Sequence, residues 1–378
     1  MNGSATGAKS SNDSGEKPSA DPSDDVSTAV ARERYLRPLF RAVLSTIIFI
    51  VLIALMAWRT VQLFAHKAPP FTFAWADSNV VAFMSAYGLG SAYAIGRWTA
   101  TRTLTKFYEI LIRISHKLRN HRLHSLRHYG IATGLSIAFV AVTVAASLTA
   151  TIQLMQGYRS FYSETNLFGL EPFVALIIAV ASAIATLIFY NLHRIVIVQL
   201  EEFNVELEET SRGEGLASSL PSLLPRHSSL LDLSCDLARG CSSFASFATM
   251  GSITASFNVI FIVMALKDLS IMSTAVSYLW LMVTSALIYF TLFIMSSLQS
   301  KLEKTSRIIV KDKSIAESPE AIQLANLMVS RIERYPTQIV LFGFIPVGKT
   351  MGHLIISIAP DLAWIMVILY KAHLLGNH

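Results

Sequence analysis

The residue best placed for chemistry in an apolar setting is Asp361, which follows Pro360 within the last long apolar stretch of the sequence. An ionisable side chain at membrane depth is costly, so it usually faces a bundle interior or an aqueous path. Pro360 also frees a backbone carbonyl at this depth. Two interpretations stay open: Asp361 lies on an ion path or gate, or it is a buried acid that packs its helix.

Helical spacing places other side chains of this stretch beside Asp361. Ser357 lies one turn before it, and Trp364 and Ile365 lie about one turn after it. Residues three or four apart lie on the same side of a helix. The sequence therefore predicts a partly polar line along one face of the last apolar helix.

No other group of reactive residues has the spacing of a catalytic or metal site. Cys235 and Cys241 are six residues apart and lack the partners of a zinc site. The histidines within 116–128 lie among cations, which disfavours a divalent metal. Residues 343–350 match the spacing of a phosphate-binding loop, but an apolar stretch follows and Pro346 removes an amide donor. The sequence predicts no enzyme, no metal site and no cofactor.

Aromatic residues gather near the ends of apolar stretches, on the side opposite most of the charge. Rings of this kind form a belt at the membrane interface or pack between helices. They also suit a pocket for a small molecule, which is mostly apolar. The candidates for such a pocket are Tyr87, Tyr93, Tyr158, Tyr162, Tyr278 and Trp280.

The composition of the 378 residues indicates what kind of elements carry these side chains. Hydrophobic residues make up 53% and charged residues 15%, and the mean hydropathy is +0.49. Soluble domains average roughly 25% charged residues, so a soluble globular protein is excluded. The formal net charge of +6 must first be read as a signal of membrane orientation, and nucleic acid is not an expected partner.

Seven apolar stretches are long enough to cross a bilayer as helices. Residues 1–31 precede them as a polar segment that is predicted to be a disordered tail, and 32–378 form the membrane domain. The predicted spans lie near 42–65, 78–96, 130–155, 169–191, 244–266, 274–297 and 350–371.

Lysine and arginine set the predicted orientation, because cytoplasmic loops carry their excess. The tail, the segment before the first span and every second loop hold most of the 31 basic residues. The opposite side and the span ends that face it hold only Arg59, Lys67, Arg159, Lys267 and Lys371. The sequence therefore predicts a cytoplasmic N-terminus and an extracellular C-terminus.

Amphipathic patterns continue from several spans into the predicted cytoplasmic side. Apolar residues recur at helical spacing within 192–243 and 298–349. One further helix begins at Ser318, a capping residue, with Pro319 in its first turn. The fold class is thus all-α, with seven spans and cytoplasmic helical extensions. These extensions either lie on the inner leaflet or pack within one chain, or they form a bundle where several subunits assemble.

This arrangement resembles the insect gustatory and odorant receptor superfamily, and in length and style its nematode gustatory-receptor-like members, such as serpentine receptor class r. The gustatory signature of the last helix is Thr-Tyr, five apolar residues and Gln-Phe. The chain has Ala363-Trp364, then five apolar residues over 365–369, then Tyr370-Lys371. The spacing and one aromatic residue match, whereas the threonine, glutamine and phenylalanine do not.

The resemblance implies a homotetrameric or heteromeric ligand-gated cation channel in the plasma membrane. It implies that the last helix lines a central pore and that a small molecule binds in the outer half of each subunit. Membrane lipids and further subunits are the expected partners. The candidates for pore and gate are then Ser357, Asp361, Trp364, Ile365 and Ile368.

Two other classes remain as alternatives. A G-protein-coupled receptor also has seven spans, but it places its N-terminus outside and commonly has an outer disulfide. A secondary transporter would use Asp361 as its ion or proton site, although the spans show no obvious internal repeat.

Overall fold

The computed structural model describes residues 47, 50–51, 53–62, 65, 69–70, 72–107, 109–110, 122–155, 171–213, 215–265, 271–334, 338–347 and 351–376. The chain divides into two compact units, Met1–Leu52 and Ile53–His378. In the first unit, the described residues Ile47, Ile50 and Val51 are helical and exposed. The predicted tail 1–31 lies outside the described residues.

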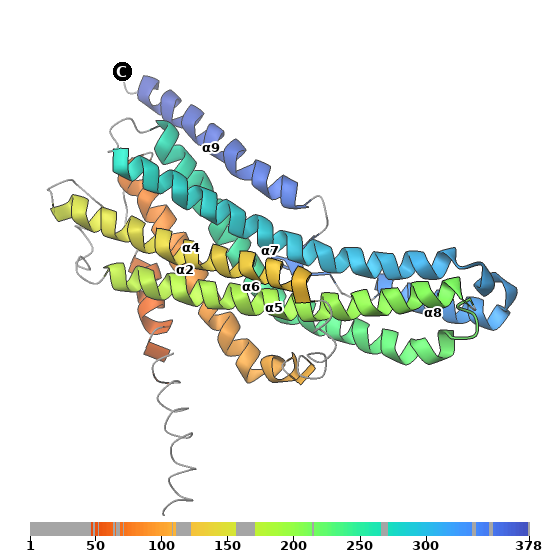
Figure 1. Ribbon diagram of the computed structural model, residues 1–378. Helices are drawn as coiled ribbons and strands as arrows, with labels where there is room; N and C mark the ends of the chain where they lie inside the picture. Colours follow the sequence, from red (N-terminus) through yellow and green to blue (C-terminus); the bar gives the residue numbers. More distant parts are fainter. Residues whose placement is uncertain are drawn as a thin grey trace, which may run out of the picture. The chain divides into compact units, whose positions relative to one another are not determined.

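The second unit consists mainly of long helices (Figure 1). Residues 53–62 are helical, and the elements after them are α2 (Phe73–Ala100), α4 (Arg122–Met155), α5 (Glu171–Arg212), α6 (Leu220–Ala265), α7 (Ile271–Lys311), η2 (Lys313–Glu317), α8 (Pro319–Arg334), β1 (Val340–Leu341), β2 (Ile345–Pro346) and α9 (Met351–Gly376). The predicted all-helical character is confirmed for the described residues, apart from one short hairpin among them.

Four helices in the described part of the chain are long and apolar enough to cross a membrane. The candidate spans lie in Gly130–Thr149, Pro172–Arg212, Leu220–Met264 and Thr274–Lys311. Each falls on a predicted apolar stretch, and these stretches make the protein a membrane protein. Seven spans and the orientation of the termini remain predictions.

Helix α6 occupies a central place in the second unit. It packs most extensively against α2 and also against α5, α7, α8, β1 and α9. Helices α4, α5 and α7 form a second group of mutual contacts. Phe244 of α6 lies where these groups meet, with its ring centroid 5.3 Å from that of Phe189 in α5 and 5.6 Å from that of Trp98 in α2.

Helices α5, α6 and α7 continue beyond their apolar parts, and α8 packs beside α6 and α7 (Figure 1). Their inward faces are apolar, with Leu200, Phe203 and Leu207 of α5 fully buried. Their outer faces carry ion pairs, such as Lys301 to Glu201 at 2.9 Å and Lys304 to Glu208 at 2.9 Å. These extensions therefore form a packed bundle within one chain.

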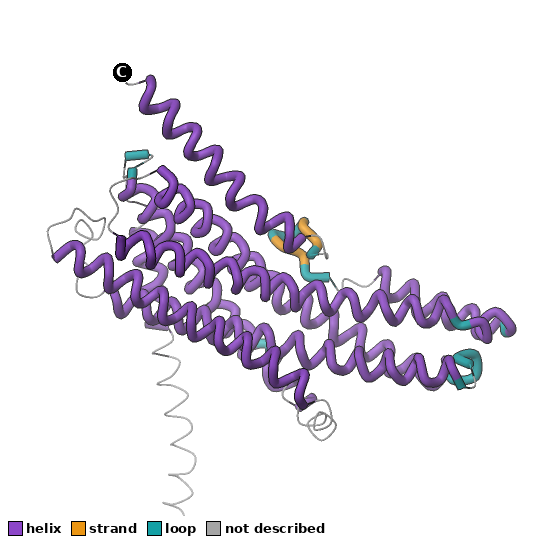
Figure 2. Tube along the Cα trace, turned by 45° about the horizontal axis from the view of Figure 1, so that its top comes forward, coloured by secondary structure: helices purple, strands orange, loops and turns teal. Residues whose placement is uncertain are grey.

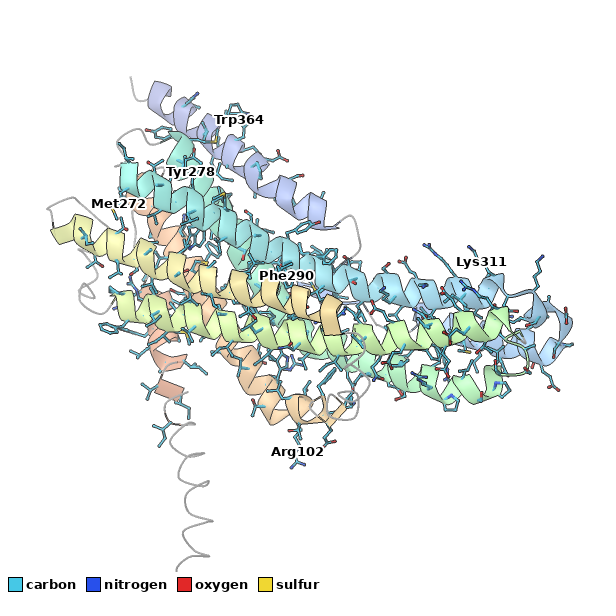
Figure 3. All side chains as sticks on the ribbon, viewed as in Figure 1. Arg102, Met272, Tyr278, Phe290, Lys311 and Trp364 are labelled. Atoms are coloured by element: carbon cyan, nitrogen blue, oxygen red, sulfur yellow. The ribbon has the colours of Figure 1, made fainter. Side chains whose placement is uncertain are left out.

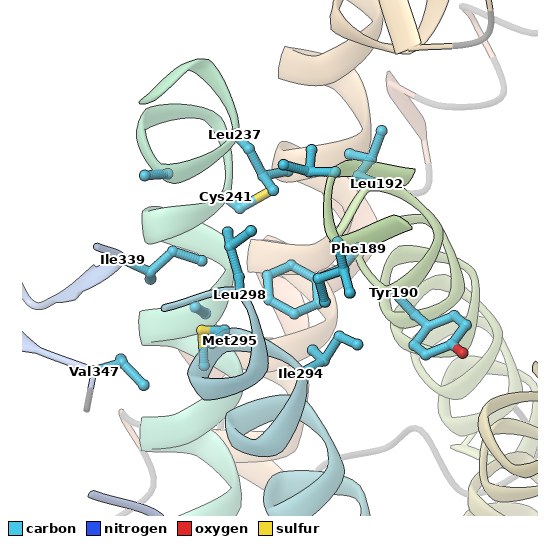
Figure 4. Packing of buried hydrophobic residues seen from close by; sticks show 14 of the residues in the cluster. Phe189, Tyr190, Leu192, Leu237, Cys241, Ile294, Met295, Leu298, Ile339 and Val347 are labelled. Carbon is cyan, nitrogen blue, oxygen red and sulfur yellow. The ribbon is translucent and has the colours of Figure 1, made fainter. Parts of the chain in front are cut away.

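A two-stranded antiparallel hairpin lies between α8 and α9 in the chain (Figure 2). Val340 pairs with Pro346 and Leu341 with Ile345, and the turn places Phe342 and Gly343 at positive φ. Ile339 and Val347 flank the strands and point into the apolar core near Cys241, Met295 and Leu298 (Figure 4). The hairpin is thus held by burial of side chains at both of its ends.

Candidate functional site

Helix α9 is attached to the rest of the unit along one face. Ala363 and Val367 are buried there. Val367 belongs to a small apolar cluster with Ala76, Phe261 and Ile262. Tyr370 extends this contact, because its ring lies edge-on to that of Phe261 at 5.9 Å between centroids. The main partner of α9 is α6, with a smaller contact to α7.

The opposite face of α9 carries all the pore and gate candidates. They are Ser357, Asp361, Trp364, Ile365 and Ile368, and each is exposed. Figure 3 shows Trp364 on the side of α9 turned away from α7. The structure therefore brings these five residues onto one surface, which the described part of the chain leaves uncovered.

Tyr87 of α2 is buried in the middle of the bundle. Its hydroxyl lies 3.1 Å from the hydroxyl of Thr186 in α5, and its ring contacts those of Phe139 and Phe244 at 6.3 and 6.2 Å. Four helices thus meet at this side chain. Among the pocket candidates that the structure describes, Tyr87 has the most ring and hydrogen-bond partners from other helices.

The remaining pocket candidates do not gather around Tyr87. Tyr93 and Tyr278 are exposed, and Trp280 is buried two residues beyond Tyr278 in α7 (Figure 3). Tyr158 and Tyr162 lie outside the described residues. A pocket in the outer half that unites these aromatic rings therefore stays a prediction.

A cavity of about 660 Å³ lies between α2, α6 and the hairpin. Its walls are mainly apolar, and Tyr87 forms part of one wall. The lining residues are Phe83, Ala86, Tyr87, Ser242, Ser243, Ser246, Phe247, Met250, Gly251, Val340, Phe342 and Gly343. Sequence reasoning missed this cavity, because no pattern indicates that a hairpin lies beside α6.

One hydrogen bond ties the hairpin to α6 at this cavity, and another closes the hairpin itself. The Phe342 N–H donates to the Ser246 hydroxyl at 2.8 Å, and the Val347 N–H donates to the Ile339 carbonyl at 2.9 Å. The segment from Gly343 with the spacing of a phosphate-binding loop begins inside this hairpin. Pro346 lies in β2, and the apolar helix α9 begins at Met351.

Charged groups cluster on the part of the bundle beyond the apolar helices. Arg226 of α6 pairs with Glu206 of α5, lies 3.9 Å from Glu202, and sits 5.7 Å from the centre of the Phe203 ring. Burial and the nearby Arg331 lower the pKa of His227 to about 4. His227 is therefore a neutral side chain inside a charged bundle at pH 7.

The described residues offer no site for a bound metal. Among them, no three His, Cys, Asp or Glu side chains come together. Both cysteines are buried free thiols, and burial raises the pKa of Cys235. These thiols are poor nucleophiles at neutral pH, because the reactive form is the thiolate.

Comparison with known proteins yields one family and one fold. Residues 25–363 match the family described as "Caenorhabditis protein of unknown function, DUF267". No curated protein matches the sequence.

The fold is similar to that of the insect olfactory receptor OR5 from Machilis hrabei. The TM-score is 0.62 at 16% identity, over 86% of this chain and 87% of that one. For the same receptor in complex with eugenol, the TM-score is 0.67 at 14% identity, over 87% of this chain and 90% of the receptor chain. This likeness shows the fold, whereas the superfamily and its nematode subtype stay predictions.

Proposed function

Because the chain belongs to the family described as Caenorhabditis protein of unknown function, DUF267, and has the fold of an insect olfactory receptor, we propose that it is a chemosensory-type receptor that forms an oligomeric ligand-gated cation channel. In this proposal a small molecule binds within each subunit and α9 lines the ion path. The gustatory-like character, four subunits, seven spans and a place in the plasma membrane belong to the proposal as well.

The one-sided attachment of α9 is the observation that carries this function. Asp361 is exposed near the centre of a helix that is otherwise almost wholly apolar. Lipid is a poor environment for an acid at that depth, whereas a water-filled path between subunits accommodates it. The exposed face of α9 therefore fits the interior of an oligomer better than it fits surrounding lipid.

The candidates along this face of α9 suit both a polar ring and an apolar constriction of an ion path. Ser357 and Asp361 supply oxygen atoms that attract cations, as rings of acidic side chains do in cation channels. Trp364, Ile365 and Ile368 continue the same face with large apolar groups, which can close a pore by excluding water. Several copies of α9 around one axis would thus combine a polar ring with an apolar constriction.

The experiment that tests this function replaces Asp361 by asparagine. The purified full chain is placed in planar bilayers, and its reversal potential is measured in a tenfold KCl gradient. We expect the wild type to prefer K⁺ over Cl⁻ and Asp361→Asn to lose much of that preference, because the ring of negative charge is removed.

Asp232→Asn is the matched control, because Asp232 is an exposed acid on the extension of α6. This variant should keep the wild-type reversal potential. Equal selectivity in the wild type and in Asp361→Asn would remove Asp361 from the ion path. Coupled proton uptake without channel openings would instead favour the transporter alternative.

A further inference from the structure

We propose that the cavity between α2, α6 and the hairpin binds a long acyl chain whose carbonyl or carboxylate oxygen accepts a hydrogen bond from Ser243. This binding site shares Tyr87 with the predicted pocket in the outer half but none of that pocket's other candidates, and it does not depend on channel activity. It adds a lipid-like ligand at a place that neither the fold nor the family description assigns.

The walls of the cavity match the chemistry of an acyl chain. Phe83, Phe247, Met250 and Phe342 supply aromatic and thioether surface. Phe247, Met250 and Phe342 are each 40 to 49% exposed, so the cavity is open to the outside of the single chain. A volume of about 660 Å³ lies within the range of roughly 300 to 1,000 Å³ that is usual for small-molecule sites.

The inner end of the cavity is closed by a tight contact between α2 and α6. A Cβ atom added at Gly251 would lie 3.0 Å from the Tyr87 Cβ and 3.3 Å from the Phe83 carbonyl oxygen. No side chain fits between the helices at this point. The apolar part of a ligand would therefore end against Tyr87 and Gly251.

The polar end of the cavity is formed by serines of α6. Ser242 donates to the Ala238 carbonyl at 2.6 Å, and Ser246 donates to the Ser242 carbonyl at 2.8 Å. Ser243 differs, because it accepts from the Arg97 guanidinium at 3.3 Å and its hydroxyl hydrogen has no acceptor among the described residues. Ser243 is therefore the hydroxyl that can donate to a ligand oxygen, with a positive charge beside it.

Charge along the two helices gives the ligand one orientation. No charged residue occurs in 78–96 of α2 or in 242–265 of α6, whereas Arg97 and Arg239 lie just beyond these segments. Met250 is seven residues from Ser243, or about 10 Å along the helix, on the uncharged side. The cavity thus spans the boundary at which an amphiphile in a bilayer places its head group.

The test uses the full chain in nanodiscs of phosphatidylcholine with two photoreactive probes. One is a palmitate analogue with a diazirine in its chain, and the other is a phosphatidylcholine with the same diazirine. Labelled positions are mapped by mass spectrometry. We expect saturable labelling of residues 242–251 and 340–344 that excess palmitate or lipid displaces. The probe that labels these residues at the lower concentration identifies the source of the ligand: a free fatty acid or a membrane lipid.

Two variants examine the two ends of the ligand. Ala86→Trp fills the cavity from α2 and should lower labelling at least fivefold, whereas Ala100→Trp at the exposed end of α2 should not. Ser243→Ala removes the donor and should raise the half-saturating probe concentration about fivefold to tenfold, as loss of one hydrogen bond beside a charge does. Ser222→Ala, an exposed serine of the same helix, is its control.

Other outcomes would overturn the proposal. Labelling that spreads evenly over exposed apolar residues such as Phe173 and Ile365, or that Ala86→Trp leaves unchanged, would show ordinary lipid contact. Absence of labelling in the cavity, together with a smaller oligomer for Ala86→Trp, would assign the surface to a second copy of the chain. Because no current is measured, these results are independent of the Asp361 experiment.

Discussion

Asn204 joins α5 to α7 through both ends of its side-chain amide. Its Nδ2 donates to the Lys301 carbonyl at 3.0 Å, and its Oδ1 accepts from the Thr305 hydroxyl at 2.6 Å. Both side chains are buried between apolar neighbours. A buried polar pair of this kind fixes the register of two helices, because any other register leaves its donors without partners.

Asn204→Ala should lower the free energy of unfolding of the bundle by about 1 to 3 kcal/mol, because the Thr305 hydroxyl and the Lys301 carbonyl each lose a partner. Thermal unfolding of the full chain in detergent measures the change. Val205→Ala is the control: Val205 is the next residue and is exposed, so its effect should stay within about 0.5 kcal/mol. Equal effects of the two variants would contradict this role.

His227 makes the bundle sensitive to acid. Its neighbours include Arg331 and Arg226, together with the ring of Phe203 at 6.0 Å. Because its pKa is about 4 in the folded state and 6.5 is the ordinary value, the unfolded chain binds more protons between these values. The contribution of neutral His227 to the free energy of unfolding is therefore fully present above about pH 6.5, and it is lost as the pH drops toward 4.

Because of His227 alone, the free energy of unfolding should be about 1 kcal/mol lower at pH 5.5 than at pH 7.5. His227→Leu should remove that share of the pH dependence, because leucine binds no proton. Unfolding midpoints of both proteins at the two pH values measure it. The same drop in both would assign the acid sensitivity to other groups.

At the scale of elements, glycines determine how closely α2 and α6 approach. Added Cβ atoms at Gly90 and Gly251 would lie 2.7 Å from the Phe247 ring and 3.0 Å from the Tyr87 Cβ. Small residues of this kind let membrane helices pack backbone to backbone. The sequence shows the glycines, but only the packing shows which helix each one faces.

Gly251→Ala should destabilise the protein by about 1 to 3 kcal/mol, because the new methyl group meets a backbone carbonyl that cannot turn away. Gly130→Ala in α4 should be neutral or stabilising, since nothing lies within 4 Å of the added Cβ and alanine favours helix. Unfolding of both variants in one detergent compares them. A milder effect at Gly251 than at Gly130 would contradict the close α2–α6 contact.

At the scale of the whole molecule, the distribution of basic residues predicts which side each end occupies. An epitope tag after His378 should be reached by antibody on intact cells, and a tag before Met1 only after permeabilisation. The physical reason is that loops rich in Lys and Arg are retained in the cytoplasm. A C-terminal tag that needs permeabilisation would overturn the orientation and revive the G-protein-coupled alternative.

The apolar stretches by themselves determined a helical membrane protein, since helices satisfy their own backbone hydrogen bonds in lipid. Helical spacing likewise determined that Ser357, Asp361 and Ile365 share a face. Only the tertiary structure decided that the described part of the chain leaves this face uncovered, and that a hairpin beside α6 lines a cavity together with α2. Such contacts join residues far apart in the chain, such as Phe342 and Ser246, and local periodicity carries no information about which helix packs beside which.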